Sequence, residues 1–233
     1  MPTNDLSQNT GRRGFIGSLA AGAATLGIAN LAAPLQSFAG TPTPVGNMAD
    51  PDVWMSQVKS KKHKIVYDSP EPKGIFAFAW PRVFLLTNAA TGTPEKDCGV
   101  VVVLRHESIP FAMEDRLWEK YKFGETFKIN DAAGKPVAKN GFWKPASGTY
   151  SVPGFGVIQI GIDELQASGV MFCVCDAALT VYSAALAQGM GKDAAEVKKD
   201  WVSGILPGIQ IVPSGVWALG RAQENGCGYI FAG

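Results

Sequence analysis

A run of apolar β-branched residues in the middle of the chain constrains the fold more than any other feature. Gly99 is followed by four consecutive valines and Leu104, and polar residues bound the run on both sides. A strand without alternating polar positions is buried on both faces, which is typical of the centre of a parallel sheet. We therefore expect a sheet with helices on both sides.

Strand-like and helix-like segments alternate along the rest of the chain. Such alternation predicts right-handed crossovers, and therefore an α/β fold with a mostly parallel sheet covered on both faces. We expect strands over 63–68, 97–106, 170–175, 209–212 and 228–231, and helices over 110–121, 163–168, 176–188, 194–202 and 216–225.

Composition excludes several classes of function. The 233 residues are 46% hydrophobic and 18% charged with a formal net charge of +1, as in an ordinary single-domain globular protein. Near-neutral charge without a long basic stripe argues against nucleic-acid binding. His63 and His106 are the two histidines, so one subunit lacks a multi-histidine metal site. We expect neither a metal nor a cofactor.

The amino-terminal segment has the pattern of a twin-arginine export signal. Arg12 and Arg13 precede a stretch rich in Ala and Gly, and 37–39 offers a small-x-small cleavage site. The apolar stretch is interrupted by glycine and barely reaches the ~20 residues that a membrane span needs. We predict that 1–39 is removed and that the mature protein is periplasmic, without a stable membrane span.

The mature chain divides into three parts. Residues 40–62 are polar and contain three prolines, as expected for a linker or arm. Residues 63–233 form the predicted domain. Within it, 122–160 has repeated Gly, Pro, Lys and aromatic residues without a sustained period, which predicts an inserted flap or hairpin.

Cys175 is the first candidate for a chemical centre. It ends the strand over 170–175, and Asp176 then opens a helix. Open α/β sheets place reactive groups at the carboxyl ends of strands, and a helix amino terminus favours a thiolate. We therefore predict Cys175 as the catalytic residue and Asp176 as part of the binding site.

Cys173 stands two residues earlier in the same strand. Alternate residues of a strand face the same side, so both sulfurs are expected to point toward one layer of helices. Cys173 is then a redox partner for Cys175 or half of a soft-metal site. The other interpretation is a small buried hydrophobe, the usual role of a strand cysteine.

Two further strand ends supply polar candidates. Arg105 and His106 follow the valine-rich strand, and Ser214 and Gly215 follow the strand over 209–212. A histidine there lowers a thiol pKa or carries a proton, unless a loop carbonyl simply satisfies it. Ser214 and Gly215 open a helix whose N–H groups bind anions, although serine at that position is usually only a cap.

Cys98 and Cys227 each open a strand, at the opposite edge of the sheet from Cys175. They form a disulfide only if their strands are neighbours. Four cysteines allow three complete pairings, and the sequence does not choose among them.

The segment Gly169–Leu179 resembles the active-cysteine strand of the DsrE/DsrF-like family, within the DsrEFH superfamily. Ile211–Leu219 is similar to the strand, Ser-Gly turn and helix of that family, and Leu104–Glu107 falls at its second strand. The resemblance extends over most of 63–232. It implies a three-layer αβα fold with about five parallel strands, assembled as a trimer or hexamer.

The resemblance also implies sulfur relay, in which Cys175 carries a persulfide between a sulfur donor and an acceptor protein. The alternative function is a non-catalytic periplasmic protein that binds a small ligand or metal or supports assembly. A third interpretation leaves Cys173 and Cys175 in the core and places function in 122–160.

Overall fold

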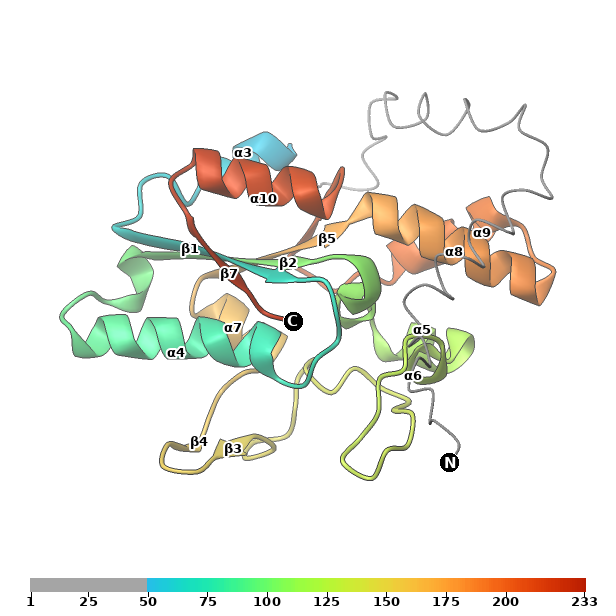
Figure 1. Cartoon of the computed structure of the whole chain (residues 1–233), viewed down its shortest axis with the longest axis horizontal. Helices are drawn as coiled ribbons and strands as arrows, with labels where there is room; N and C mark the ends of the chain where they lie inside the picture. Colours follow the sequence, from blue (N-terminus) through green and yellow to red (C-terminus); the bar gives the residue numbers. More distant parts are fainter. Residues whose placement is uncertain (1–49) are drawn as a thin grey trace, which may run out of the picture. The chain divides into compact units, whose positions relative to one another are not determined.

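Five strands form the central sheet in the order β6-β5-β2-β1-β7, and every neighbouring pair is parallel (Figure 1). The computed structural model describes residues 50–233, so the expected export signal over 1–39 lies outside the described residues. The strands are β1 (His63–Ser69), β2 (Cys98–Leu104), β5 (Val170–Cys175), β6 (Ile209–Val212) and β7 (Gly228–Phe231).

The valine-rich strand occupies the centre of the sheet, as its sequence predicts. β2 pairs with β1 on one side and β5 on the other, and each of its residues is buried. Its side chains alternate between two cores. Val100 and Val102 contribute to one core, whereas Val101 and Val103 contribute to the other.

Helices cover both faces of this sheet, which confirms the predicted three-layer αβα arrangement (Figure 1). On one face lie α4 (Phe76–Ala90) and α7 (Ile162–Ala167). On the other face lie α3 (Pro51–Ser56) and α10 (Gly215–Glu224). The short 3-10 helix η2 (Glu95–Asp97) leads into β2.

Two more helix pairs extend the α4 side of the core. The helices α8 (Asp176–Met190) and α9 (Ala194–Ser203) follow β5 and pack against each other. α9 also contacts α5 (Asp115–Tyr121) and α6 (Phe123–Thr126) through an aromatic cluster that includes Trp201.

The helix expected over 110–121 is divided in two. Residues His106–Ala112 form the 3-10 helix η3, with Pro110 inside it, and Met113 is extended with φ −120° before α5 begins. Proline fits a tight turn here because its nitrogen needs no hydrogen-bond acceptor. The chain therefore changes direction between the two helices.

A few apolar side chains of the segment 122–160 anchor it to the core, while most of its residues are exposed. It contains α6 and a two-stranded antiparallel sheet of β3 (Ser151–Val152) and β4 (Gly156–Val157). Phe123 and Phe142 are buried against the main core, whereas Phe155 at the hairpin tip is 69% exposed. The exposed stretches are thus 131–136, 146–149 and the β3–β4 hairpin, and buried side chains between them hold the segment to the core.

The segment expected as a linker or arm also contains packed structure where it is described. Asp50 caps α3 through its side chain, and Trp54 and Met55 are buried against α10. Residues 40–49 of that segment lie outside the described residues. None of the helices within 50–233 is long and apolar enough to cross a membrane.

Candidate functional site

The carboxyl ends of three neighbouring strands, β2, β5 and β6, gather the candidate residues at one edge of the sheet. Leu104 of β2 pairs with Val174 of β5. The next residues along the chain, Arg105 and Cys175, therefore lie side by side at the ends of these two strands. Cys175 in turn pairs with Val212 of β6, shortly before Ser214. Parallel register therefore brings together residues that are far apart in sequence.

Cys175 is the N-cap residue of α8 and is 6% exposed. Its Sγ accepts a hydrogen bond from the Ala178 N–H at 3.3 Å. The Ala177 N–H donates to the Pro213 carbonyl at 3.2 Å, which fixes the start of α8 against the turn before α10. An N–H directed at the sulfur stabilises negative charge there, as does the positive end of the helix dipole.

Arg105 makes a two-point ion pair with Asp68 at the end of β1. Its Nε lies 2.6 Å from Oδ1, and its Nη2 lies 2.9 Å from Oδ2. The Tyr229 hydroxyl of β7 donates to the same Oδ2 at 2.8 Å. The hydrogen bond to Asp68 raises the pKa of Arg105, and Cys175 contributes a smaller increase.

Asp68 and Tyr229 were not among the residues that the sequence indicated. Asp68 is 2% exposed, so it is a buried carboxylate at the end of an apolar strand. An acidic residue at that position is the signal that identifies Asp68 in the sequence, since buried carboxylates are normally paired. Tyr229 carries no such signal, because its role depends on β7 lying beside β1.

Gly215 lets Arg105 reach this position. A Cβ added at Gly215 would lie 2.5 Å from Arg105 Cβ and 2.7 Å from its Cδ. Ser214 acts as the cap of α10, since its Oγ accepts from the Trp217 N–H at 3.1 Å. Gly215 is therefore required for the close approach between Arg105 and the start of α10. The Ser214 hydroxyl oxygen is used as the cap of that helix.

Asp176, which was expected in the binding site, pairs with a lysine of α9. Its carboxylate forms an ion pair with Lys198 Nζ at 2.8 Å, which joins α8 to α9. The side chain therefore serves the contact between those helices, although its residue adjoins Cys175.

His106 lies at the exposed rim of the site. Its backbone is left-handed, with φ 53°, and its ring contacts Tyr182 edge-on at a centroid distance of 5.6 Å. Tyr182 lies seven residues after Cys175, or about 10 Å along α8. Within residues 50–233, no hydrogen bond joins His106 to Cys175.

The two cysteines of β5 join different cores, in contrast to the expectation of one shared layer. Cys173 is fully buried on the α3 and α10 side, whereas Cys175 belongs to the core on the α4 side. The difference arises because Cys175 ends its strand and caps α8. Burial raises the pKa of the Cys173 thiol, with a smaller increase from Cys175.

Cys98 and Cys227 do not meet the condition for a disulfide. β1 lies between β2 and β7, and the two residues join cores on opposite faces of the sheet. All four cysteines are free. Across the described part of the chain, no cluster of three His, Cys, Asp or Glu side chains is placed to hold a metal.

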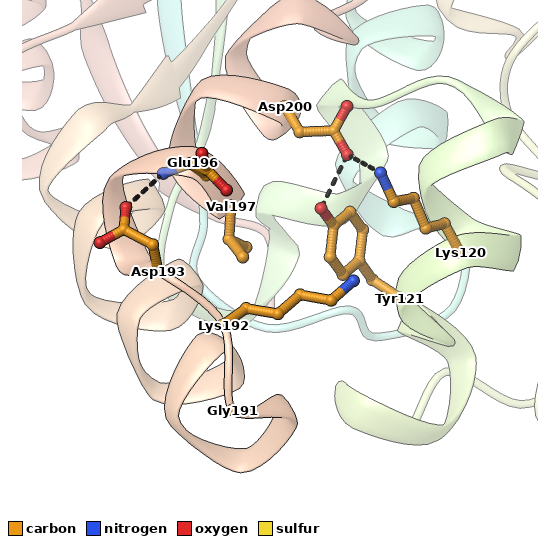
Figure 2. Close-up of a pocket in the computed structure, with 8 residues that line it drawn as sticks. All are labelled: Lys120, Tyr121, Gly191, Lys192, Asp193, Glu196, Val197 and Asp200. Atoms are coloured by element: carbon orange, nitrogen blue, oxygen red, sulfur yellow. Dashed lines mark hydrogen bonds and ion pairs between the residues drawn. The ribbon is translucent and has the colours of Figure 1, made fainter.

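A hollow of about 520 Å³ lies between α5, α9 and the turn after α8 (Figure 2). Figure 2 shows Lys120 and Tyr121 directed at Asp200, whose Oδ2 accepts from both at 2.7 Å. Gly191 on its wall ends α8, about 24 Å from Cys175 along the helix. The hollow is thus remote from the strand-end residues, and the sequence did not indicate it.

Asp200 is the centre of the polar contacts at that hollow. Arg116 Nη1 also binds it, at 2.7 Å from Oδ1. Burial alone would raise the pKa of Asp200, but hydrogen bonds from Lys120, Tyr121 and Arg116 together lower it well below the usual range. These contacts join α5 to α9, and each oxygen of the Asp200 carboxylate already has a hydrogen-bond donor.

The fold and the gathered residues define an α/β protein with a cysteine at the carboxyl edge of a parallel sheet. No family model matches the chain, and no curated protein matches it. Among solved structures it is similar to MTH1491, a protein of unknown function from Methanobacterium thermoautotrophicum. That match has 16% identity and a TM-score of 0.39, covering 73% of this chain and 99% of the other. Because both values are low, the fold class rests on the strand order and helix layers.

Proposed function

We propose that the protein is an exported, DsrE/DsrF-like sulfur carrier in which Cys175 holds a persulfide. The observation that carries this proposal is the placement of the Cys175 sulfur. It lies at the carboxyl edge of the sheet, accepts the Ala178 N–H and adjoins Arg105 on the next strand. The export pattern over 10–39 supports a periplasmic location.

The reaction needs no cofactor when thiosulfate is the donor. The Cys175 thiolate attacks the outer, sulfane sulfur, and a new bond forms between Sγ and that atom. The sulfur–sulfur bond of thiosulfate breaks, and its electron pair leaves with sulfite. The thiolate and the thiosulfate dianion thereby become a persulfide anion and a sulfite dianion. The thiol proton passes to water before the attack.

The immediate surroundings favour a small donor. Cys175 is 6% exposed, and the Arg105 side chain next to it is 26% exposed. A donor of a few atoms needs less opening of the site than a protein thiol. Transfer onward to an acceptor protein would then follow from the persulfide, whose outer sulfur extends beyond Sγ.

We also propose that the protein acts as a homo-oligomer, a trimer or hexamer. The exposed face of α4 supports this assembly. Phe76, Trp80 and Leu86 are 45%, 40% and 43% exposed, and Arg82, the one charged residue of α4, is 6% exposed. Exposed apolar surface of this kind is typical of protein interfaces, and another copy of the chain can cover it without opposing like charges.

Release of sulfite tests the proposed chemistry. Wild-type protein incubated with thiosulfate should release one sulfite per chain, and Cys175→Ser should release none. Cys173→Ser is the matched control, because it changes a buried thiol two residues away and should release as much sulfite as the wild type. Sulfite release by Cys175→Ser, or none by the wild type, would overturn the proposal.

A further inference from the structure

A buried charge network lies beside Cys175 and is not explained by the persulfide step alone. Asp68 is 2% exposed, and both of its oxygens accept hydrogen bonds. Arg105 supplies two of these bonds, and the Tyr229 hydroxyl supplies a third. A buried ion pair costs desolvation energy, so it contributes little stability on its own account.

The network holds the Arg105 guanidinium in one place. Asp68 fixes Nε and Nη2, and the close approach of Gly215 confines the side-chain stem at Cβ and Cδ. Tyr229 in turn holds the carboxylate from the edge strand β7. The guanidinium is therefore oriented before any donor arrives, which reduces the entropy lost on binding.

Arg105 also keeps capacity for another ligand. Its side chain is 26% exposed, and within the described residues Nη1 has no protein acceptor. A guanidinium is planar and always charged, and it binds oxyanions through paired N–H groups. Its neighbour on the adjacent strand is the nucleophile candidate Cys175.

We propose that Arg105 determines the specificity of the Cys175 site, with Asp68 and Tyr229 as positioning residues, and that the site takes small oxyanionic sulfane donors such as thiosulfate in preference to neutral ones. The inference rests on the proposed function for the identity of the transferred atom. The preference for anions depends only on the charges around Cys175.

Asp68 has a second effect in this arrangement. Its carboxylate shares the guanidinium and offsets part of the positive charge that an incoming anion meets. A dianionic leaving group such as sulfite is therefore held less tightly and departs. Asparagine keeps one oxygen that accepts from Arg105, so Asp68→Asn removes the negative charge while the guanidinium stays held. This variant should strengthen the preference for anions, whereas removing the Arg105 charge should weaken it.

Alkylation of Cys175 measures this preference without sulfur transfer. Iodoacetate and iodoacetamide are similar in size and differ in charge, and peptide mapping counts modification at Cys175 alone. The ratio of the iodoacetate rate to the iodoacetamide rate should fall about threefold in Arg105→Gln, because this variant loses one partly offset positive charge. It should rise in Asp68→Asn and stay near the wild-type value in Arg105→Lys.

Two further variants keep the test decisive. If Arg105→Gln does not fold, the double variant with Asp68→Asn removes both charges and leaves none buried and unpaired. Its ratio should also fall below that of the wild type. Arg221→Gln changes an arginine on α10 that pairs with Asp52 and Glu224, and it should leave the ratio unchanged.

The outcomes separate the two proposals. An unchanged ratio in both Arg105→Gln and the double variant overturns the role of Arg105, whatever the sulfite measurement gives. If the ratio changes as expected but the wild type releases no sulfite from thiosulfate, the persulfide function is overturned and the anion preference stands.

Discussion

Arg105 and Asp68 form a two-point ion pair across the carboxyl ends of β2 and β1, with contacts of 2.6 and 2.9 Å. The carboxylate is buried, whereas the guanidinium reaches partly into solvent beside Cys175. The ion pair thus joins β1 to β2 at this edge of the sheet, and it also places a positive charge at the candidate site.

Breaking this pair on one side should destabilise the protein more than removing it altogether. Arg105→Gln leaves Asp68 buried without its counter-ion, which should cost about 3 kcal/mol. The double variant with Asp68→Asn should recover most of that loss. Urea unfolding of the four proteins of the cycle measures the coupling. Additive losses would show that the two side chains act independently.

Gly215 should tolerate no side chain. Gly215→Ala places a Cβ 2.5 Å from Arg105 Cβ, so the arginine must shift, at a cost of about 1–3 kcal/mol. Gly220→Ala is the matched control on the same helix, because its Cβ would meet nothing within 4 Å. It should instead stabilise α10 by about 0.5–1 kcal/mol. Equal unfolding midpoints for the two variants would refute the close approach.

Asp200 should stabilise the protein in a pH-dependent way. Its pKa is lowered in the folded state by hydrogen bonds from Lys120, Tyr121 and Arg116, which outweigh the opposing effect of burial. A lowered carboxyl pKa contributes stability above the unfolded pKa of about 4, and this contribution disappears as the pH falls through the folded pKa.

Unfolding of Asp200→Asn at pH 7 and below pH 4 tests that sign. The variant should be less stable than the wild type at pH 7, and the gap should shrink steadily in acid. Glu119→Gln, an exposed change on α5, is the control and should show little difference at either pH. A gap that widens in acid would contradict the assignment.

A single negative charge added to the exposed face of α4 should weaken self-association. Light scattering should give a trimer or hexamer for the wild type, and Trp80→Glu should shift the mass toward the monomer, since a buried unpaired carboxylate is costly. Val53→Glu adds the same charge at a 63% exposed position of α3 on the other face, and should not change the mass. A monomeric wild type would rule out this assembly.

The main features of the sheet could be predicted from the sequence. The four valines specify a central strand, and parallel strands bring their carboxyl ends to one edge, so Arg105, Cys175 and Ser214 were expected together. Local backbone changes were not predictable. The left-handed conformation of His106 places its ring against Tyr182 on the exposed rim.

The partners of the site residues were harder to foresee, because they depend on tertiary packing. Tyr229 and Asp68 are separated by 161 positions and meet only because β7 lies beside β1. Asp176 adjoins Cys175 in sequence, yet Lys198 of α9 pairs with its carboxylate. Sequence therefore identified the strand ends, and the fold determined which charges reach them.

Intact-mass measurement after incubation with thiosulfate tests the central claim most directly. The wild type should gain the mass of one sulfur atom, lose it on treatment with dithiothreitol, and carry it on the peptide that contains Cys175. Cys173→Ser should behave as the wild type, and Cys175→Ser should gain nothing. A wild-type protein without the adduct, or an adduct that persists in Cys175→Ser, would contradict the account.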